Sequence, residues 1–195
     1  MKQVSLIALA ITTLVASSAW GATPADQEVT QRNINQQDRI EQGLQSGQLS
    51  THEAGKLERD ESRVNRLEAH DLKDGKLTGR ETAQINAAQN RTSRQIDRQK
   101  HDSQVGNPGS ASSERMQHDV QRDANQQSRI KAGEASGALS NRESGALERG
   151  QARTDRREFN AARNGRIGAG EQRGIQRAQT RQSHRVFRRK HNAAG

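Results

Sequence analysis

The chain has 195 residues, a formal net charge of +9 and no cysteine. Apolar residues make up 29 % of it and aromatic residues 2 %, which excludes a large close-packed apolar core. The lack of cysteine excludes disulfides, thiolate metal sites and a cysteine nucleophile. Helix-forming Ala, Arg, Gln and Glu are frequent and there are only 2 prolines, so we expect long helices rather than a disordered coil.

Residues 1–21 have the pattern of a secretory signal peptide. Lys2 precedes an apolar run over 4–15, and residues 19–21 place small side chains at the −3 and −1 positions of a cleavage site. The apolar run is too short to span a membrane, and no second run follows it. We therefore expect a periplasmic or secreted protein without a membrane span after cleavage.

The remainder of the chain is an internal duplication. A shift of 90 residues aligns the two halves without a gap, and about 30 of some 71 positions between 31 and 101 are identical to their counterparts. Residues 103–118, which contain Pro108 and several Gly and Ser, predict a flexible linker. The sequence thus predicts helical module 1 over 22–102 and a strongly basic helical module 2 over 119–192, each expected to fold by itself.

Turn signals divide each half into three helices. Glycines suited to helix ends stand at Gly47, Gly75, Gly137 and Gly165. Capping boxes follow at Ser50/Glu53, Thr78/Glu81 and Ser140/Glu143, while the fourth, Gly168/Glu171, lacks the hydroxyl. The expected helices in the first half cover 28–45, 50–73 and 78–100, and the final helix runs from about 170 to 190. The expected fold class is all-α, with two tandem three-helix modules made of capped helical hairpins.

The same turn pattern resembles an EF-hand loop in its spacing of Gly, an aliphatic residue and Glu. The only set of plausible calcium ligands is His70, Asp74 and Glu81. A calcium loop needs more converging oxygens, usually beginning with Asp, so helix capping explains the turns better. We favour no metal site and no cofactor, and keep calcium binding by these three residues as the alternative.

Catalytic motifs are missing from the sequence. There is no nucleophile elbow, phosphate loop or dinucleotide fingerprint. Each Asp and Glu lies in a charged helical segment, where we expect it to face solvent rather than to form a buried carboxylate pair. We therefore predict a protein that is not an enzyme.

Charge is unevenly distributed between the halves. Residues 22–104 carry 13 basic and 14 acidic side chains, whereas 105–195 carry 18 basic and 9 acidic ones. On the final helix, Ile175, Ala178 and Val186 share one face. The opposite face and the helix end carry the residues that we call the arginine stripe: Arg173, Arg177, Arg181, Arg185, Arg188, Arg189 and Lys190.

Guanidinium groups in such a row suit bidentate contact with phosphates or carboxylates. We therefore predict non-specific polyanion binding, with anionic envelope components or other polyanions as partners. Because aromatic side chains are scarce, sequence-specific recognition of nucleic acid is not expected. The oligomeric state is left open.

Three repeated signatures carry a resemblance to known proteins: Asn-Gln-Gln-x-Arg-Ile at 35–40, Ser-Gly-x-Leu-Ser-x-x-Glu at 46–53 and Lys-His at 100–101. With them the chain resembles a group of uncharacterised exported proteins of Gram-negative bacteria with tandem helical repeats, over nearly all of the cleaved chain. The resemblance implies an envelope location. A looser similarity, over 77–81, links it to small helical periplasmic chaperones.

The expected function is accordingly that of an exported non-enzymatic helical repeat protein, a binding or structural protein of the cell envelope with polyanion affinity. Two alternatives remain open: a periplasmic stress chaperone, and a degenerate EF-hand-like protein that responds to calcium or another metal.

Overall fold

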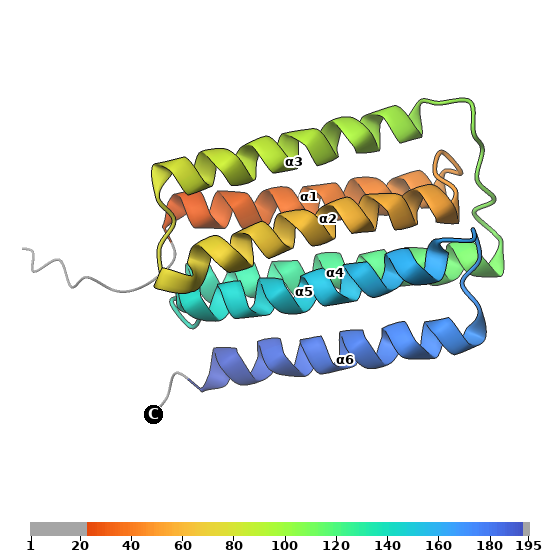
Figure 1. Ribbon diagram of the computed structural model, residues 1–195. Helices are drawn as coiled ribbons and strands as arrows, with labels where there is room; N and C mark the ends of the chain where they lie inside the picture. Colours follow the sequence, from red (N-terminus) through yellow and green to blue (C-terminus); the bar gives the residue numbers. More distant parts are fainter. Residues whose placement is uncertain (1–22, 193–195) are drawn as a thin grey trace, which may run out of the picture.

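The computed structural model describes residues 23–192, which fold into helices joined by short turns, without a strand in that range (Figure 1). The helices are α1 (Pro24–Gln45), α2 (Thr51–Asp71), the 3-10 turn η1 (Leu72–Asp74), α3 (Gly79–Lys100), α4 (Ala111–Ala135), α5 (Asn141–Ala162) and α6 (Ala169–His191). The all-α prediction is confirmed. None of these helices is both long and apolar enough to cross a membrane. The predicted signal peptide lies outside the described residues.

Local capping chemistry sets the helix ends, as the sequence predicts. At the start of α2, the Ser50 hydroxyl accepts a hydrogen bond from the Glu53 backbone at 3.3 Å, and the Glu53 carboxylate accepts one from the Ser50 backbone at 2.9 Å. At α6 the Glu171 carboxylate still accepts from the Gly168 backbone at 2.8 Å, although the hydroxyl is absent. The four predicted turn glycines have φ values from +71° to +95°, where a side chain would be strained.

The two halves pack against each other along their whole length. Helices α1, α2, α4 and α5 form a central bundle, with α3 along α1 and α2 on one side and α6 along α4 and α5 on the other (Figure 1). Gly55 of α2 lies against Ala162 of α5, and their counterparts Gly145 and Leu72 make the equivalent contact. This pairing makes α2 and α5 antiparallel and relates the halves by an approximate two-fold axis.

The division into two separate three-helix modules is not confirmed, because the apolar core is shared. One buried cluster contains Ile40 and Leu57 from the first half together with Met116 and Ile175 from the second. The α2–α5 contact is so close that a Cβ on Gly55 would lie 2.6 Å from the Cβ of Ala162. Within 103–118, the segment predicted as a linker, the first residues form the loop and the remainder, from Ala111, belongs to α4.

Cutting the loop between α3 and α4 is expected to leave the two halves associated. A single protease site introduced at Gln104 would release the halves only if they packed independently, whereas the shared core holds them together. After cleavage, both fragments should co-elute at the volume of the intact protein in size-exclusion chromatography with unchanged helical circular dichroism. Separate elution of two helical fragments would instead support independently folding modules.

Candidate functional site

The arginine stripe lies on the outer side of α6, which is anchored to the bundle by its opposite face. Ile175 and Val186 are fully buried, as are three glutamines between and beside them. Of the stripe residues, Arg173, Arg177, Arg181 and Arg188 are exposed, and Arg185, Arg189 and Lys190 are half-buried. The stripe is therefore placed to meet a ligand, and its binding role stays a prediction.

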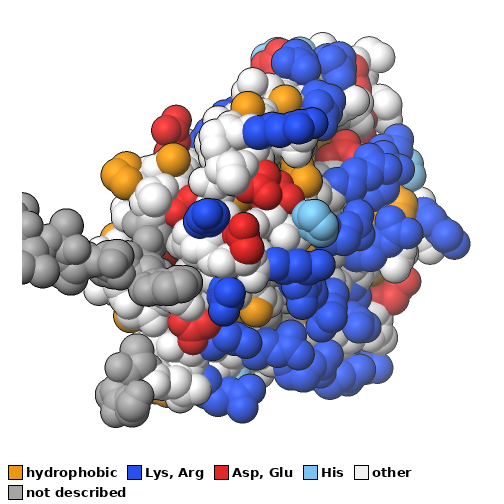
Figure 2. Space-filling model, turned by 60° about the vertical axis from the view of Figure 1, so that its left-hand side comes forward, with side chains coloured by type: hydrophobic (Ala, Val, Ile, Leu, Met, Phe, Trp, Pro, Cys, Tyr) orange, Lys and Arg blue, Asp and Glu red, His pale blue; other side chains and the backbone are white. Residues whose placement is uncertain are grey.

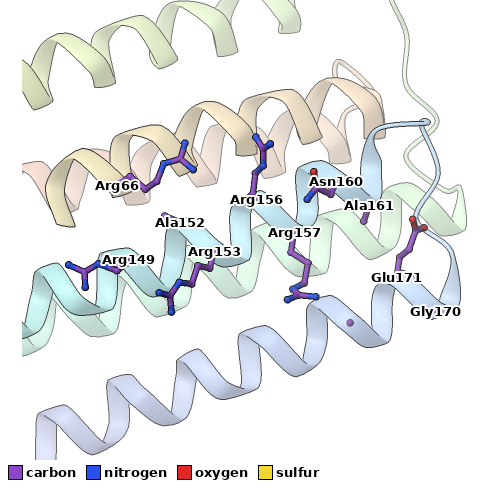
Figure 3. A pocket seen from close by; sticks show the side chains of 11 residues that line it. Arg66, Arg149, Ala152, Arg153, Arg156, Arg157, Asn160, Ala161, Gly170 and Glu171 are labelled. Atoms are coloured by element: carbon purple, nitrogen blue, oxygen red, sulfur yellow. The ribbon is translucent and has the colours of Figure 1, made fainter. Parts of the chain in front are cut away.

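A second set of arginines, which sequence analysis did not single out, surrounds a groove beside the stripe (Figure 3). The groove has a volume of about 730 Å³. We call it the basic groove, and its arginines are Arg149, Arg153, Arg156 and Arg157 of α5 with Arg66 of α2. Gly170 and Gly174 of α6 line the opposite wall, and because they have no side chains they leave the space open. The spacing of three and four residues along α5 was the available sequence signal.

The groove arginines form no ion pair among the described residues, and Glu171 is the one acid in the lining of the groove. Arg156 lies over the Phe159 ring at 5.1 Å, and none of the five pairs with a carboxylate. In the first half the equivalent Arg63 pairs with Asp60 at 2.5 Å. The counterpart of Asp60 is Gly150, so the second half has no acid at the position that pairs with Arg63 in the first half.

Burial of acids makes the surface of the second half more basic than its composition indicates. Six of its nine acidic side chains are buried: Asp119, Asp123, Glu134, Glu148, Asp155 and Glu158. Only Glu114, Glu143 and Glu171 remain to offset 18 basic side chains, none of which is buried. A broad Lys/Arg surface accordingly spreads over one side of the molecule (Figure 2).

The residues of the calcium alternative already take part in the turn between α2 and α3. His70 Nδ1 lies 2.8 Å from Asp71 Oδ1, and Asp74 accepts a hydrogen bond from the Lys76 backbone at 3.1 Å. Glu81 accepts hydrogen bonds from the backbone and hydroxyl of Thr78, which lower its pKa. These contacts show the capping role, while calcium binding stays a prediction.

The expectation that all acidic side chains face solvent is wrong. Twelve Asp and Glu side chains are buried. Two rows face each other across the bundle with the same spacing of three, four and three residues: Glu58, Glu61, Asn65 and Glu68 on α2, and Glu148, Gln151, Asp155 and Glu158 on α5. The duplication repeats this polar pattern 90 residues later in the chain. That repetition was the sequence signal for the two buried rows.

Four of these acids converge at one point of the core. One oxygen from each lies within 4.8 Å of the others, and we call them the acidic cluster: Glu58, Asp123, Asp155 and Glu158. Burial raises the pKa of Glu58 to about 7 and, together with the charges of neighbouring carboxylates, raises the pKa of the other three well above their usual range. Among the described His, Asp and Glu side chains, these four carboxylates form a group that could ligate a metal ion.

Comparison with known proteins gives no assignment: no protein-family model, curated protein or solved structure matches the chain. The resemblance to exported helical repeat proteins therefore stays a prediction, and function has to be argued from the residues.

Proposed function

We propose that this chain is an exported, non-enzymatic binding or structural protein of the cell envelope, periplasmic or secreted, which holds polyanions through the basic groove and the arginine stripe. The observation that supports this most is the groove itself, where five arginines surround one space and none forms an ion pair with Glu171, the acid in its lining. The pattern of residues 1–21 supports export.

The chemistry of the surface favours a polymer with repeated phosphates or carboxylates. Guanidinium groups form bidentate hydrogen bonds with both, and several weak contacts along one chain add up to useful affinity. The groove takes one anionic segment, and the stripe on the adjacent α6 contacts the segments beside it. Phe187 is the large exposed apolar residue near the stripe, so stacking on bases contributes little and sequence is not read.

The two three-helix units, 22–102 and 119–192, arose by duplication and have since come to differ in charge. In the first half Asp60 lies beside the arginines, whereas the arginines of the second half have no acid at the equivalent position. The stress-chaperone alternative and calcium binding by His70, Asp74 and Glu81 stay predictions, because no observation among the described residues favours either over polyanion binding.

Neutralising the groove is expected to weaken polyanion binding about tenfold or more at low salt, since each lost cation removes one counterion-releasing contact. The variant is Arg149→Gln/Arg153→Gln/Arg157→Gln, and replacing Arg177, Arg181 and Arg185 in the same way tests the stripe. Binding to fluorescent heparin, lipopolysaccharide and duplex DNA would be followed by anisotropy across a salt series. The slope of log affinity against log salt should also become shallower.

The approximate two-fold provides a matched control. Arg91→Gln/Arg94→Gln/Arg98→Gln removes the same charge from α3, the counterpart of α6, and should change affinity by less than about threefold. If this control weakens binding as much as the groove and stripe variants do, only net charge matters. If none of the variants changes binding, the proposed surface is wrong.

A further inference from the structure

The acidic cluster lies in the centre of the bundle, away from the basic surface. Its carboxylates come from three helices, with Glu58 on α2, Asp123 on α4, and Asp155 and Glu158 one turn apart on α5. Each side chain is at most 2 % exposed. No Lys or Arg forms an ion pair with any of the four in the described part of the chain. Four acids thus share a space that no protein cation enters.

The surrounding amides orient the acidic cluster without satisfying it. Three hydrogen bonds reach it: Gln37 donates to Glu58 at 3.1 Å, Asn65 to Asp155 at 2.8 Å and Gln179 to Glu158 at 3.0 Å. Each of these three acids keeps one buried oxygen without a donor, and no amide or hydroxyl donates to Asp123, whose hydrogen bond is a proton shared with Glu158. Buried polar atoms are seldom left without a partner, so these oxygens need either shared protons or a bound cation. Acids that neighbouring amides hold in place are typical of metal ligands.

The duplication supplies an internal comparison. The counterparts of the acidic cluster are Glu148, Asn33, Asn65 and Glu68, which we call the amide cluster. There the Asn33 amide nitrogen lies 3.0 Å from both oxygens of Glu68 and 3.4 Å from Asn65 Oδ1. Two acids are replaced by amides, and the Asn33 amide satisfies both oxygens of Glu68, so that Glu148 Oε1 is the one carboxylate oxygen of the amide cluster left without a donor. The bundle can therefore be filled without four converging carboxylates, and the acidic version needs another explanation.

The geometry selects the kind of ion. Oxygens on opposite sides of a cation bound at about 2.0 to 2.5 Å are about 4 to 5 Å apart, and the four cluster oxygens lie within 4.8 Å of one another. One ion therefore fits among them. Because all ligands are carboxylate oxygens and the chain has no cysteine, a hard divalent ion is preferred over a soft one.

We propose that the acidic cluster binds one hard divalent cation, of the Mn²⁺ or Ca²⁺ class, in the core of the four-helix bundle. The site is distinct from the turn between α2 and α3 and is independent of polyanion binding. Binding displaces protons that the crowded carboxylates otherwise share, and it joins α2, α4 and α5 across the two halves. The ion therefore stabilises the association of the halves.

The test is metal retention by the full chain. The protein is unfolded in denaturant with chelator, refolded separately with Mn²⁺, Ca²⁺, Mg²⁺ or Zn²⁺, and dialysed, after which bound metal is counted by mass spectrometry. We expect about one equivalent of Mn²⁺ or Ca²⁺ per chain, and a melting temperature several degrees higher than in the chelator-treated sample. Less than about 0.1 equivalent of every ion in a folded sample would overturn the proposal.

Two variants locate the ion. Asp123→Asn/Asp155→Asn gives the acidic cluster the composition of the amide cluster and should abolish retention, with helical content unchanged. Glu68→Gln changes one acid in the amide cluster and should leave retention intact. Equal retention by wild type and the double variant would overturn the proposal. If the double variant does not fold, Asp123→Asn alone, scored by the loss of the Mn²⁺-induced rise in melting temperature, decides in its place.

Discussion

Raising the pH from 5 to 8 is expected to lower the free energy of unfolding of the chelator-treated protein by several kcal/mol. In the folded protein, burial raises the pKa of Glu58 and Asp119 to about 7 and that of Glu148 to about 8. In the unfolded chain these groups have ordinary pKa values near 4. Between the two values the folded state holds protons that the unfolded state has released, so stability falls as pH rises.

The size of the effect follows from the number of groups. Between its unfolded and its folded pKa, each buried acid lowers the free energy of unfolding by up to about 1.4 kcal/mol per pH unit. Glu61, Glu68 and the rest of the acidic cluster act in the same direction, since burial also raises their pKa values. The lowered pKa of Glu81 acts in the opposite direction, but this side chain is exposed and its effect is screened.

Urea unfolding followed by circular dichroism at pH 5, 6, 7 and 8 would measure this slope. The midpoint should fall steadily in chelator, and saturating Mn²⁺ should flatten the fall because the ion replaces the protons of the acidic cluster. Stability that is constant or rises over this range in chelator would show that the buried acids are hydrated rather than held in a dry core.

The helix boundaries were predictable because a few adjacent residues determine each of them. Ser50 and Glu53 form their capping box whatever packs against α2, and Gly47 ends α1 for a backbone reason alone. Such signals act within about one turn, so a single sequence reveals them. The exposed side of α6 followed from the period of Ile175 and Val186 in the same way.

The pairing of the halves was not predictable from the same kind of signal. The pairing depends on small residues such as Gly55 and Ala162, which permit close contact but do not specify which helix packs against them. Short turns between neighbouring helices indicated hairpins within each half. The structure instead places the closest contacts between α2 and α5, and nothing local distinguishes the two arrangements.

The buried acids were missed because only apolar residues were counted as core. A helix in the centre of a bundle is contacted on several sides, so it buries more positions than one stripe. With 29 % apolar residues in the chain, α2 and α5 have to fill some of these positions with polar side chains. Glu58 beside Leu57 and Asn65 beside Val64 are the result, and all four are buried.

No amide or hydroxyl donates to either oxygen of the buried Asp123, and we expect Asp123→Asn to stabilise the metal-free protein. Asp123 lies beside Glu158, and the equivalent Asn33 lies beside Glu68 in the amide cluster. An asparagine there could donate to both Glu158 oxygens, as Asn33 does to Glu68 at 3.0 Å, and would remove one buried charge. Satisfying an orphaned buried group contributes about 1 to 3 kcal/mol, which for a chain of this size raises the melting temperature by about 2 to 4 °C per kcal/mol.

The reverse substitution at the equivalent position completes the experiment. Asn33→Asp removes the donor to Glu68 and adds a third acid to the amide cluster, so it should lower the melting temperature in chelator at pH 8 by a similar amount. Mn²⁺ should stabilise the wild type and not Asp123→Asn. If Asp123→Asn raises the melting temperature and Asn33→Asp lowers it, the acidic cluster reduces the stability of the metal-free protein in return for cation binding. If both substitutions shift the melting temperature in the same direction, the amide cluster is not a valid model for the acidic cluster.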